Sequence, residues 1–257
     1  MDLHLQDKVI IVTGGGRGIG AGIVHALARE GAIPVIVSRS AEHNLATLEA
    51  IGGKGYQIAL DLTNPAACQA AVTETLRLTG RIDSLVNNAG VNDGVGLESG
   101  NYEAFMASLH KNLVHYYLMA HYALPALKAS QGSILNITSK TAETGQGNTS
   151  AYAASNGGRN ALTREWAVEL LQYGIRVNAI VVAECMTPLY ESWLQTLNDP
   201  ETTLEKIKDK IPLGKRMTTQ EEIADMAAFL LSSRSSHTTG QLIHVDGGYV
   251  HLDRALL

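Results

Sequence analysis

Short apolar runs alternate with longer amphipathic segments along most of the chain. The runs are rich in β-branched residues, as buried strands are, and lie at residues 9–12, 34–37, 56–60, 82–86, 134–137, 177–182 and 242–245. Apolar positions at helical spacing predict helices at 19–30, 41–51, from 65 onward, 102–127, 150–173 and 219–231. Because this alternation requires crossovers, we expect an α/β fold with a doubly wound, seven-stranded parallel sheet and helices on both faces.

Local signals support two of the helix starts. Asn64 is a good cap and Pro65 stands at the first helical position, where proline is tolerated. Thr219 and Glu222 have the spacing of a capping box. These signals fix where the two helices are expected to begin.

We expect residues 1–257 to form one domain, because no repeat, charge block or low-complexity run interrupts them. The stretch at about 183–212 breaks the rhythm with three prolines and two short helical pieces near 190–197 and 202–210. Ligands bind doubly wound sheets at the carboxyl ends of the strands. An irregular segment there predicts a substrate lid.

Charge and composition narrow the classes of partner. The chain has 25 acidic and 20 basic side chains, a net charge of −5, which disfavours nucleic acid and anionic membrane partners. Its apolar runs fall far short of the ~20 residues of a membrane span, and no signal peptide is expected at the N-terminus. Only two cysteines, Cys68 and Cys185, fit a reducing cytoplasm, and the nine histidines show no metal-binding spacing, so no metal site is predicted.

A glycine-rich turn follows the first strand and opens the first helix, with the sequence Thr13-Gly14-Gly15-Gly16-Arg17-Gly18-Ile19-Gly20. Glycines there let the backbone turn sharply and approach a pyrophosphate at the helix N-terminus. The alternative is a tight loop without a ligand, but the strand-turn-helix context favours a dinucleotide.

The end of the second strand bears on the choice of dinucleotide. NAD-binding proteins usually place an acid there to hold the ribose 2′-hydroxyl, whereas this chain has Ser38-Arg39. Arg39 and Arg17 can pair with a 2′-phosphate through charge-assisted bonds. We therefore expect NADP to be preferred, with NAD as an alternative acceptor; both arginines could also be ordinary surface charges.

At this point the chain resembles a known family, the short-chain dehydrogenase/reductases. The resemblance rests on the glycine turn, Asn87-Asn88-Ala89-Gly90, Asn112, Ser139 and Tyr152 in this order, and it covers nearly the whole length. It implies a Rossmann fold and hydride transfer between a nicotinamide and a carbonyl or alcohol carbon. The implied cofactor-binding residues are Gly14, Arg17, Gly18, Ile19, Gly20, Ser38, Arg39, Asp61, Leu62, Asn88, Ala89, Gly90, Tyr152, Val182 and Thr187.

The resemblance also implies catalytic roles. Tyr152 would be the acid/base, Ser139 would hold the substrate oxygen and Asn112 would anchor a proton-relay water. The family's Tyr-x-x-x-Lys, however, reads Tyr152-Ala-Ala-Ser-Asn156 here. That lysine contacts the nicotinamide ribose and favours ionised tyrosine, so Asn156 at a catalytic position predicts a loss of ~10² to 10⁴ in rate unless another group supplies the charge.

Two other side chains could supply the positive charge that Asn156 lacks. Lys140 follows Ser139 but can point away from the site as readily as toward it. Arg159 lies one helical turn past Asn156, on the side away from Tyr152, and is expected to be the poorer candidate. A second departure is Val182-Ala183, where many members have Pro-Gly before the lid.

Several segments resemble the L-fucose dehydrogenase group of sugar-oxidising members, including Asn87 to Gly94, Gly145 to Thr149, Ala183 to Tyr190 and Gly247 to Arg254. The loops after the strands are polar, which suits a polyhydroxylated substrate. The candidate substrate-binding residues are Asn92, Asp93, Ser139, Gln146, Asn148, Tyr152, Glu184 and Tyr190. The tail from Tyr249 to Ala255-Leu256-Leu257 resembles C-terminal segments that pack across a subunit interface, which implies a homotetramer.

The expected activity is oxidation of C1 of a sugar such as L-fucose to the lactone, with transfer of hydride to NADP. Two alternatives remain open at this stage. The chain could bind the dinucleotide with impaired or no catalysis because of Asn156, or it could reduce another polar carbonyl substrate. On the family mechanism alone, Asn156→Lys is predicted to raise turnover.

Overall fold

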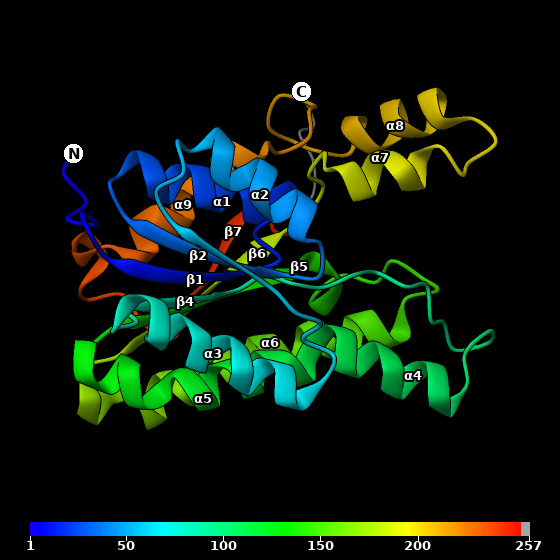
Figure 1. Cartoon of the computed structure of the whole chain (residues 1–257). Helices are drawn as coiled ribbons and strands as arrows, with labels where there is room; N and C mark the ends of the chain where they lie inside the picture. Colours follow the sequence, from blue (N-terminus) through cyan, green and yellow to red (C-terminus); the bar gives the residue numbers. More distant parts are fainter. Residues whose placement is uncertain (253–257) are drawn as a thin grey trace.

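The computed structural model describes residues 1–252, and a parallel sheet of seven strands forms its centre (Figure 1). The strands are β1 (Val9–Thr13), β2 (Ile33–Ser38), β3 (Tyr56–Ala59), β4 (Ser84–Asn87), β5 (Ser133–Ser139), β6 (Arg176–Val182) and β7 (Leu242–Val245). Their order in the sheet is β3-β2-β1-β4-β5-β6-β7, with every pair parallel. The order reverses between β1 and β4, and in doubly wound sheets ligands bind in the crevice outside the carboxyl ends of the strands at such a reversal. The predicted doubly wound sheet is confirmed.

Helices cover both faces of the sheet (Figure 1). One layer holds α1 (Gly18–Arg29), α2 (Ala41–Ala50) and α9 (Gln220–Leu231), and the other holds α3 (Pro65–Thr79), α4 (Tyr102–Leu109), α5 (His115–Ser130) and α6 (Ser150–Glu169). Alternate residues of β1 feed two cores: Val9 and Ile11 pack with one layer, and Ile10 and Val12 with the other. This division follows from the two-residue period of a strand buried on both faces.

Both predicted helix starts are confirmed. The Asn64 side chain accepts a hydrogen bond from the Ala66 N–H at the start of α3, and proline follows the cap. On α9, Thr219 and Glu222 form the complete capping box, each side chain bonded to the other residue's backbone N–H.

The helix predicted over residues 102–127 is interrupted. A π-helical segment, η1 (His110–Val114), separates α4 from α5. Asn112 lies in this segment, fully buried, and its Nδ2 donates to the Ser108 backbone oxygen at 3.1 Å. Hydrophobic periodicity does not reveal one widened turn, yet such turns are frequent at functional sites.

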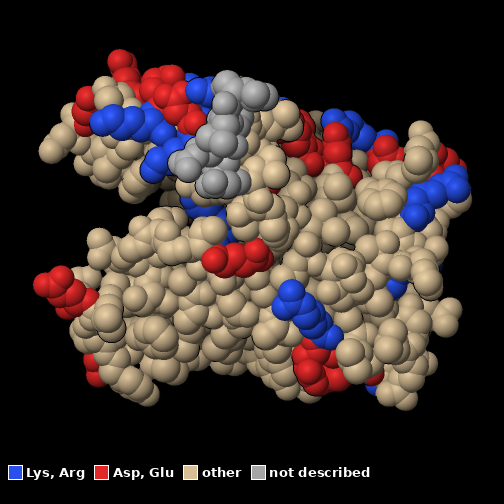
Figure 2. Space-filling model, turned by 180° about the vertical axis from the view of Figure 1, so that it is seen from behind, with Lys and Arg blue, Asp and Glu red and all other residues tan. Residues whose placement is uncertain are grey.

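Helices α7 (Pro188–Leu194) and α8 (Pro200–Asp209) project from the body beside the carboxyl ends of the strands (Figure 1). Seen from behind, this projection is densely charged, whereas much of the body below it is free of Lys, Arg, Asp and Glu (Figure 2). Among the described helices, none is long and apolar enough to cross a membrane. The segment Ala255-Leu256-Leu257, on which the predicted interface contact depends, lies outside the described residues.

Candidate active site

Ser139 and Tyr152 lie at the carboxyl end of the sheet, as expected. Ser139 ends β5, and its Oγ accepts hydrogen bonds from the Thr141 backbone N–H and hydroxyl at 3.3 and 3.1 Å. Tyr152 is in the first turn of α6 and half-buried. Beneath them, the Tyr116 hydroxyl donates to the Ile137 oxygen at 3.0 Å, and burial, with a smaller contribution from Tyr152, raises the pKa of Tyr116. Helix α6, which carries Tyr152, packs against β5 and against the turn that follows Ser139.

Asn156 is fully buried, and both ends of its amide have protein partners. Its Nδ2 donates to the Tyr152 backbone oxygen at 2.9 Å, and its Oδ1 accepts from Arg159 Nη1 at 3.0 Å. The side chain is therefore directed into the protein, with both ends of its amide occupied. Its contacts are those of a residue that positions Arg159.

Arg159 points toward Asn112 and Asn156, two of the predicted catalytic residues. It is 3% exposed, and its Nε donates to the Asn112 backbone oxygen at 2.5 Å. Its terminal nitrogens donate to Asn156, to the Ile137 oxygen at 3.3 Å and to Asn112 Oδ1 at 3.4 Å. The side chain extends back toward the N-terminus of α6, as helical side chains do, and so reaches Asn156 in the preceding turn.

The surroundings of Arg159 are neutral. Its guanidinium carbon lies 4.1 Å from the centre of the Tyr116 ring, and its hydrogen-bond partners are carbonyl and amide oxygens. Within residues 1–252 no carboxylate forms an ion pair with it. The neighbouring His115 senses the charge: burial first, and then Arg159, lower the pKa of His115 to about 4.

Lys140 is buried as well but is neutralised. Its ammonium group is ion-paired with Glu184, which also accepts a hydrogen bond from the Tyr190 hydroxyl at 2.7 Å. The ring of Tyr249 covers the Lys140 Nζ at 4.0 Å. Burial and the bond to Glu184 raise the pKa of Tyr190, so this hydroxyl stays protonated. The four side chains form a polar network beside Ser139.

The glycine turn has the close contacts that its sequence predicts. A side chain at Gly20 would collide with the Gly14 backbone oxygen, and Gly18 has a positive φ of 59°. A methyl group on Gly18 would lie 3.5 Å from Thr187 Cβ, so the start of α7 meets the turn. From β4, Asn88 Nδ2 donates to the Thr13 oxygen at 2.9 Å, which fixes the neighbouring strand end against the turn.

The residues expected to select the dinucleotide lie at the edge of the same crevice. Ser38 Oγ donates to Asn44 Oδ1 at 2.5 Å, while Arg17 and Arg39 are exposed. The Thr63 N–H, with a smaller contribution from Arg39, lowers the pKa of Asp61. The other predicted cofactor residues stand on adjacent strand ends or on the helix behind the turn: Ile19 on α1, Leu62 after β3, Ala89 and Gly90 after β4, and Val182 beside Ser139 on β6.

The predicted substrate residues divide into two groups. Glu184 and Tyr190 belong to the buried network, whereas Asn92, Gln146 and Asn148 are exposed. Asp93 accepts hydrogen bonds from Ser108 Oγ at 2.7 Å and from Lys111 Nζ at 3.3 Å. Both of its oxygens are thus used to anchor the loop after β4 to α4 and η1.

Sequence reasoning named Thr13 and Tyr249 only as members of longer segments and did not identify their contacts. Thr13 Oγ1 accepts hydrogen bonds from the N–H groups of Asn88 and Ala89 at 2.9 and 3.1 Å, so it joins two strand ends. Tyr249 reaches Lys140 from the segment after β7. No local spacing signals either contact, because the partners are 75 and about a hundred residues away.

Comparison with known proteins gives a consistent result. A family model described as enoyl-(acyl carrier protein) reductase matches residues 14–250. The L-fucose dehydrogenase of Bos taurus is 37% identical over 249 residues, 96% of this chain and 91% of that protein. A 3-oxoacyl-acyl-carrier-protein reductase of Thermotoga maritima is 35% identical, and the match covers 96% of this chain and 100% of that protein. The crystal structure of Cj0485 dehydrogenase superposes with a TM-score of 0.95 at 50% identity, and the match covers 100% of this chain and 99% of that one.

Proposed function

Because the chain belongs to the short-chain dehydrogenase/reductases, NAD(P)-dependent oxidoreductases that act on CH–OH groups, we propose that it oxidises C1 of a sugar such as L-fucose to the lactone with NADP. The observation that carries this proposal is the buried Arg159, whose guanidinium is hydrogen-bonded to Asn156 and so brings a positive charge next to the position that lacks the lysine. The similarity to L-fucose dehydrogenases and the polar network beside Ser139 support the sugar.

The crevice fits a dinucleotide. The backbone at Gly14 and Gly20 is close-packed without side chains, Thr187 faces the turn, and the free N–H groups of α1 begin there. Arg17 and Arg39 would hold the 2′-phosphate of NADP, since no carboxylate stands beside Ser38 to repel it. When bound, the nicotinamide supplies the hydride acceptor. Asp61, Leu62, Asn88, Ala89, Gly90 and Val182 would line the remainder of the cofactor site.

In this proposal Tyr152 accepts the proton of the sugar's C1 hydroxyl. Ser139 Oγ forms a hydrogen bond to the oxygen of that hydroxyl while the proton is transferred. The Thr141 hydrogen bonds orient the Ser139 hydroxyl. Asn112, held by η1 and by Arg159, would anchor the path by which the proton reaches solvent.

Arg159 would supply the electrostatic part of this chemistry. Loss of a proton leaves a negative charge on Tyr152, and a buried cation stabilises a nearby negative charge far more than an exposed one does. Asn156 is the positioning residue that accepts from the guanidinium and bonds back to the Tyr152 turn. This arrangement favours an active enzyme over a dinucleotide-binding protein without turnover.

The network of Lys140, Glu184 and Tyr190 suits a polyhydroxylated substrate better than an acyl chain. It is buried and charged, and an apolar ligand would have to be placed against it without hydrogen bonds. Asn92, Gln146 and Asn148 would add contacts at the exposed rim. We assign the lid to about 183–212, including α7 and α8, and place the enzyme in the cytoplasm as a homotetramer.

The test is NADPH formation from NADP and L-fucose across pH 7 to 10, with NAD and D-glucose run beside them. Turnover with L-fucose supports the proposal. An acetoacetyl thioester and NADPH test the reverse, acyl-reducing activity of the reductase relatives. Dinucleotide binding without turnover of any of these substrates would favour the non-catalytic alternative.

A further inference from the structure

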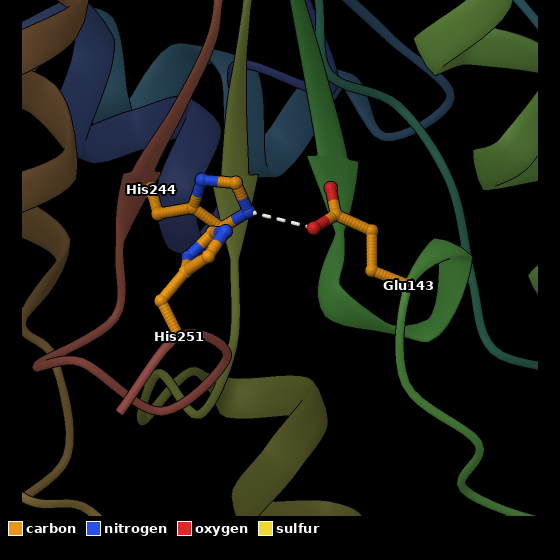
Figure 3. Close-up of side chains that lie close together, drawn as sticks. All are labelled: Glu143, His244 and His251. Atoms are coloured by element: carbon orange, nitrogen blue, oxygen red, sulfur yellow. Dashed lines mark hydrogen bonds and ion pairs between the residues drawn. The ribbon is translucent and has the colours of Figure 1, made fainter. Parts of the chain in front are cut away.

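Three side chains that are metal ligands in many proteins meet beside the edge strand β7. Glu143 comes from the loop after β5, His244 from β7 itself, and His251 from the turn that follows β7 (Figure 3). One ligand atom from each lies within 4.8 Å of the others. Glu143 Oε2 and His244 Nε2 are 3.0 Å apart, and the two imidazole rings are perpendicular with centres 4.3 Å apart. Sequence spacing predicts no such cluster, because Glu143 is a hundred residues from His244.

The distances suit a small dication. Ligand atoms about 2 Å from a tetrahedral zinc ion are separated by roughly 3.3 Å, which small side-chain rotations can reach from the present arrangement. One carboxylate and two neutral imidazoles have a charge of −1, and a dication complements that charge. The His244 and Glu143 side chains are 16% and 26% exposed, so an ion can enter and keep a water as its fourth ligand.

Two of the three ligands are held by the fold. His244 is fixed by the pairing of β7 with β6, where it lies opposite Val181. Asn160 Nδ2, on α6, donates to Glu143 Oε1 at 3.4 Å, which leaves Oε2 turned toward His244. A hydrogen bond to the second carboxylate oxygen is the kind of outer contact that orients metal ligands.

The third ligand belongs to a turn that is already ordered. The Asp246 carboxylate accepts hydrogen bonds from the Gly248 and Val250 N–H groups at 2.8 and 2.9 Å, directly before His251. The same turn places the Tyr249 ring over Lys140. An ion bound by His251 would thus fasten this turn to the loop that begins at Ser139.

We propose that Glu143, His244 and His251 form a structural site for a first-row transition dication, with Zn²⁺ as the probe ion. The ion closes the segment after β7 onto the β5–α6 loop and keeps Tyr249 over Lys140. The metal binds through Oε2 of Glu143 and one nitrogen of each imidazole, in place of the direct hydrogen bond between Glu143 and His244.

The experiment uses the full chain, stripped with EDTA and dialysed. Zn²⁺ titration followed by calorimetry is expected to give one site per chain and a rise in Tm, and Co²⁺ is expected to give the visible absorption of a four-coordinate His/carboxylate site. His251→Ala, an exposed position after the last strand, is expected to weaken Zn²⁺ binding at least about tenfold without disturbing the sheet. His244→Ala is expected to do the same, and His25→Ala, exposed on α1, provides the matched control.

Absence of stoichiometric binding overturns the proposal, as does binding that both His244→Ala and His251→Ala retain. Binding lost equally in His25→Ala would mean surface adsorption and would also overturn it. Because the readouts are metal binding and Tm, failure of the L-fucose assay would leave this result unaffected.

Discussion

Two buried cations, Lys140 and Arg159, lie near the end of β5, and their charges have different partners. Lys140 is paired with Glu184, so its charge is cancelled locally and the pair serves as a polar wall. Arg159 is surrounded by neutral oxygens and one aromatic ring, so its charge stays uncompensated within the described residues. The comparison shows that burial alone does not determine whether a cation can stabilise a negative charge in the site. The identity of its acceptors decides whether its field remains available to the site.

The largest effect should come from removal of the uncompensated cation. Arg159→Leu is expected to lower turnover at pH 7 by ~10²-fold or more and to move the rising limb of the pH–rate profile to higher pH. Arg164→Leu, on the exposed side of the same helix, is the matched control. Steady-state rates from pH 6 to 10 measure both. A uniform loss at every pH would mean that Arg159 acts only in folding.

Moving the positive charge from position 159 to position 156 tests the same comparison more sharply. Asn156→Lys alone is not expected to raise turnover, because the new ammonium would meet the Arg159 guanidinium that now bonds to position 156. This replaces the expectation drawn from the family mechanism alone. The double change Asn156→Lys with Arg159→Leu should recover activity to within about tenfold of the parent. No recovery in the double variant would argue against a charge-supplying role.

Breaking the compensated pair should affect stability. Glu184→Gln leaves the buried Lys140 ammonium without its partner and is expected to lower the free energy of unfolding by about 3 kcal/mol. Adding Lys140→Met should restore much of this loss, since the cost comes from the unpaired charge. Urea unfolding measures both, with Glu191→Gln on the exposed surface of α7 as control. Equal stability of the parent and Glu184→Gln would refute the assignment.

His115 provides a smaller, pH-dependent effect. Its pKa of about 4 lies below the unfolded value near 6.5, so the unfolded chain binds more protons between these values and stability falls as pH decreases through that window. From pH 7 to pH 5 this group alone should cost ~2 kcal/mol. His115→Gln should remove that part of the acid sensitivity in urea unfolding. In Arg159→Leu the pKa of His115, followed by NMR, should rise; an unchanged value would mean that burial accounts for the whole shift.

The smallest expected effect concerns the exposed Arg39 and the preference between NADP and NAD. Ser38→Asp places a carboxylate beside Arg39 and should move the ratio of kcat/KM values by about tenfold from NADP toward NAD. Ser38→Asn, which introduces no charge, controls for loss of the hydrogen bond to Asn44. An unchanged ratio would show that Arg39 does not contact a 2′-phosphate.

The fold was predictable because its signals are local and periodic. Strand runs, the glycine turn and the caps at Asn64 and Thr219 each depend on neighbouring residues, and each was found where expected. The π-helical segment at Asn112 was not, since one extra residue in a turn leaves the apolar pattern almost unchanged.

The site was predictable only in part. The positions of Ser139 and Tyr152 follow from strand and helix ends, but the partner of Lys140 is 44 residues away and no spacing indicates it. The contacts of Arg159 with Asn112 and Asn156 were not predicted, because the position on the helix was counted at Cα, whereas the long side chain reaches back over the preceding turn.

The close packing at Gly90 has a consequence for how the site tolerates exchange. A methyl group there would lie 2.9 Å from both Arg159 Nη2 and Asn112 Oδ1, so a side chain at position 90 would require one of these groups to move. We therefore expect positions 90, 156 and 159 to form an epistatic set, in which the effect of each exchange depends on which residues its partners already carry. A genome survey that requires lysine four positions after the tyrosine would class a chain of this kind as degenerate. A survey that reads the three positions jointly would retain it.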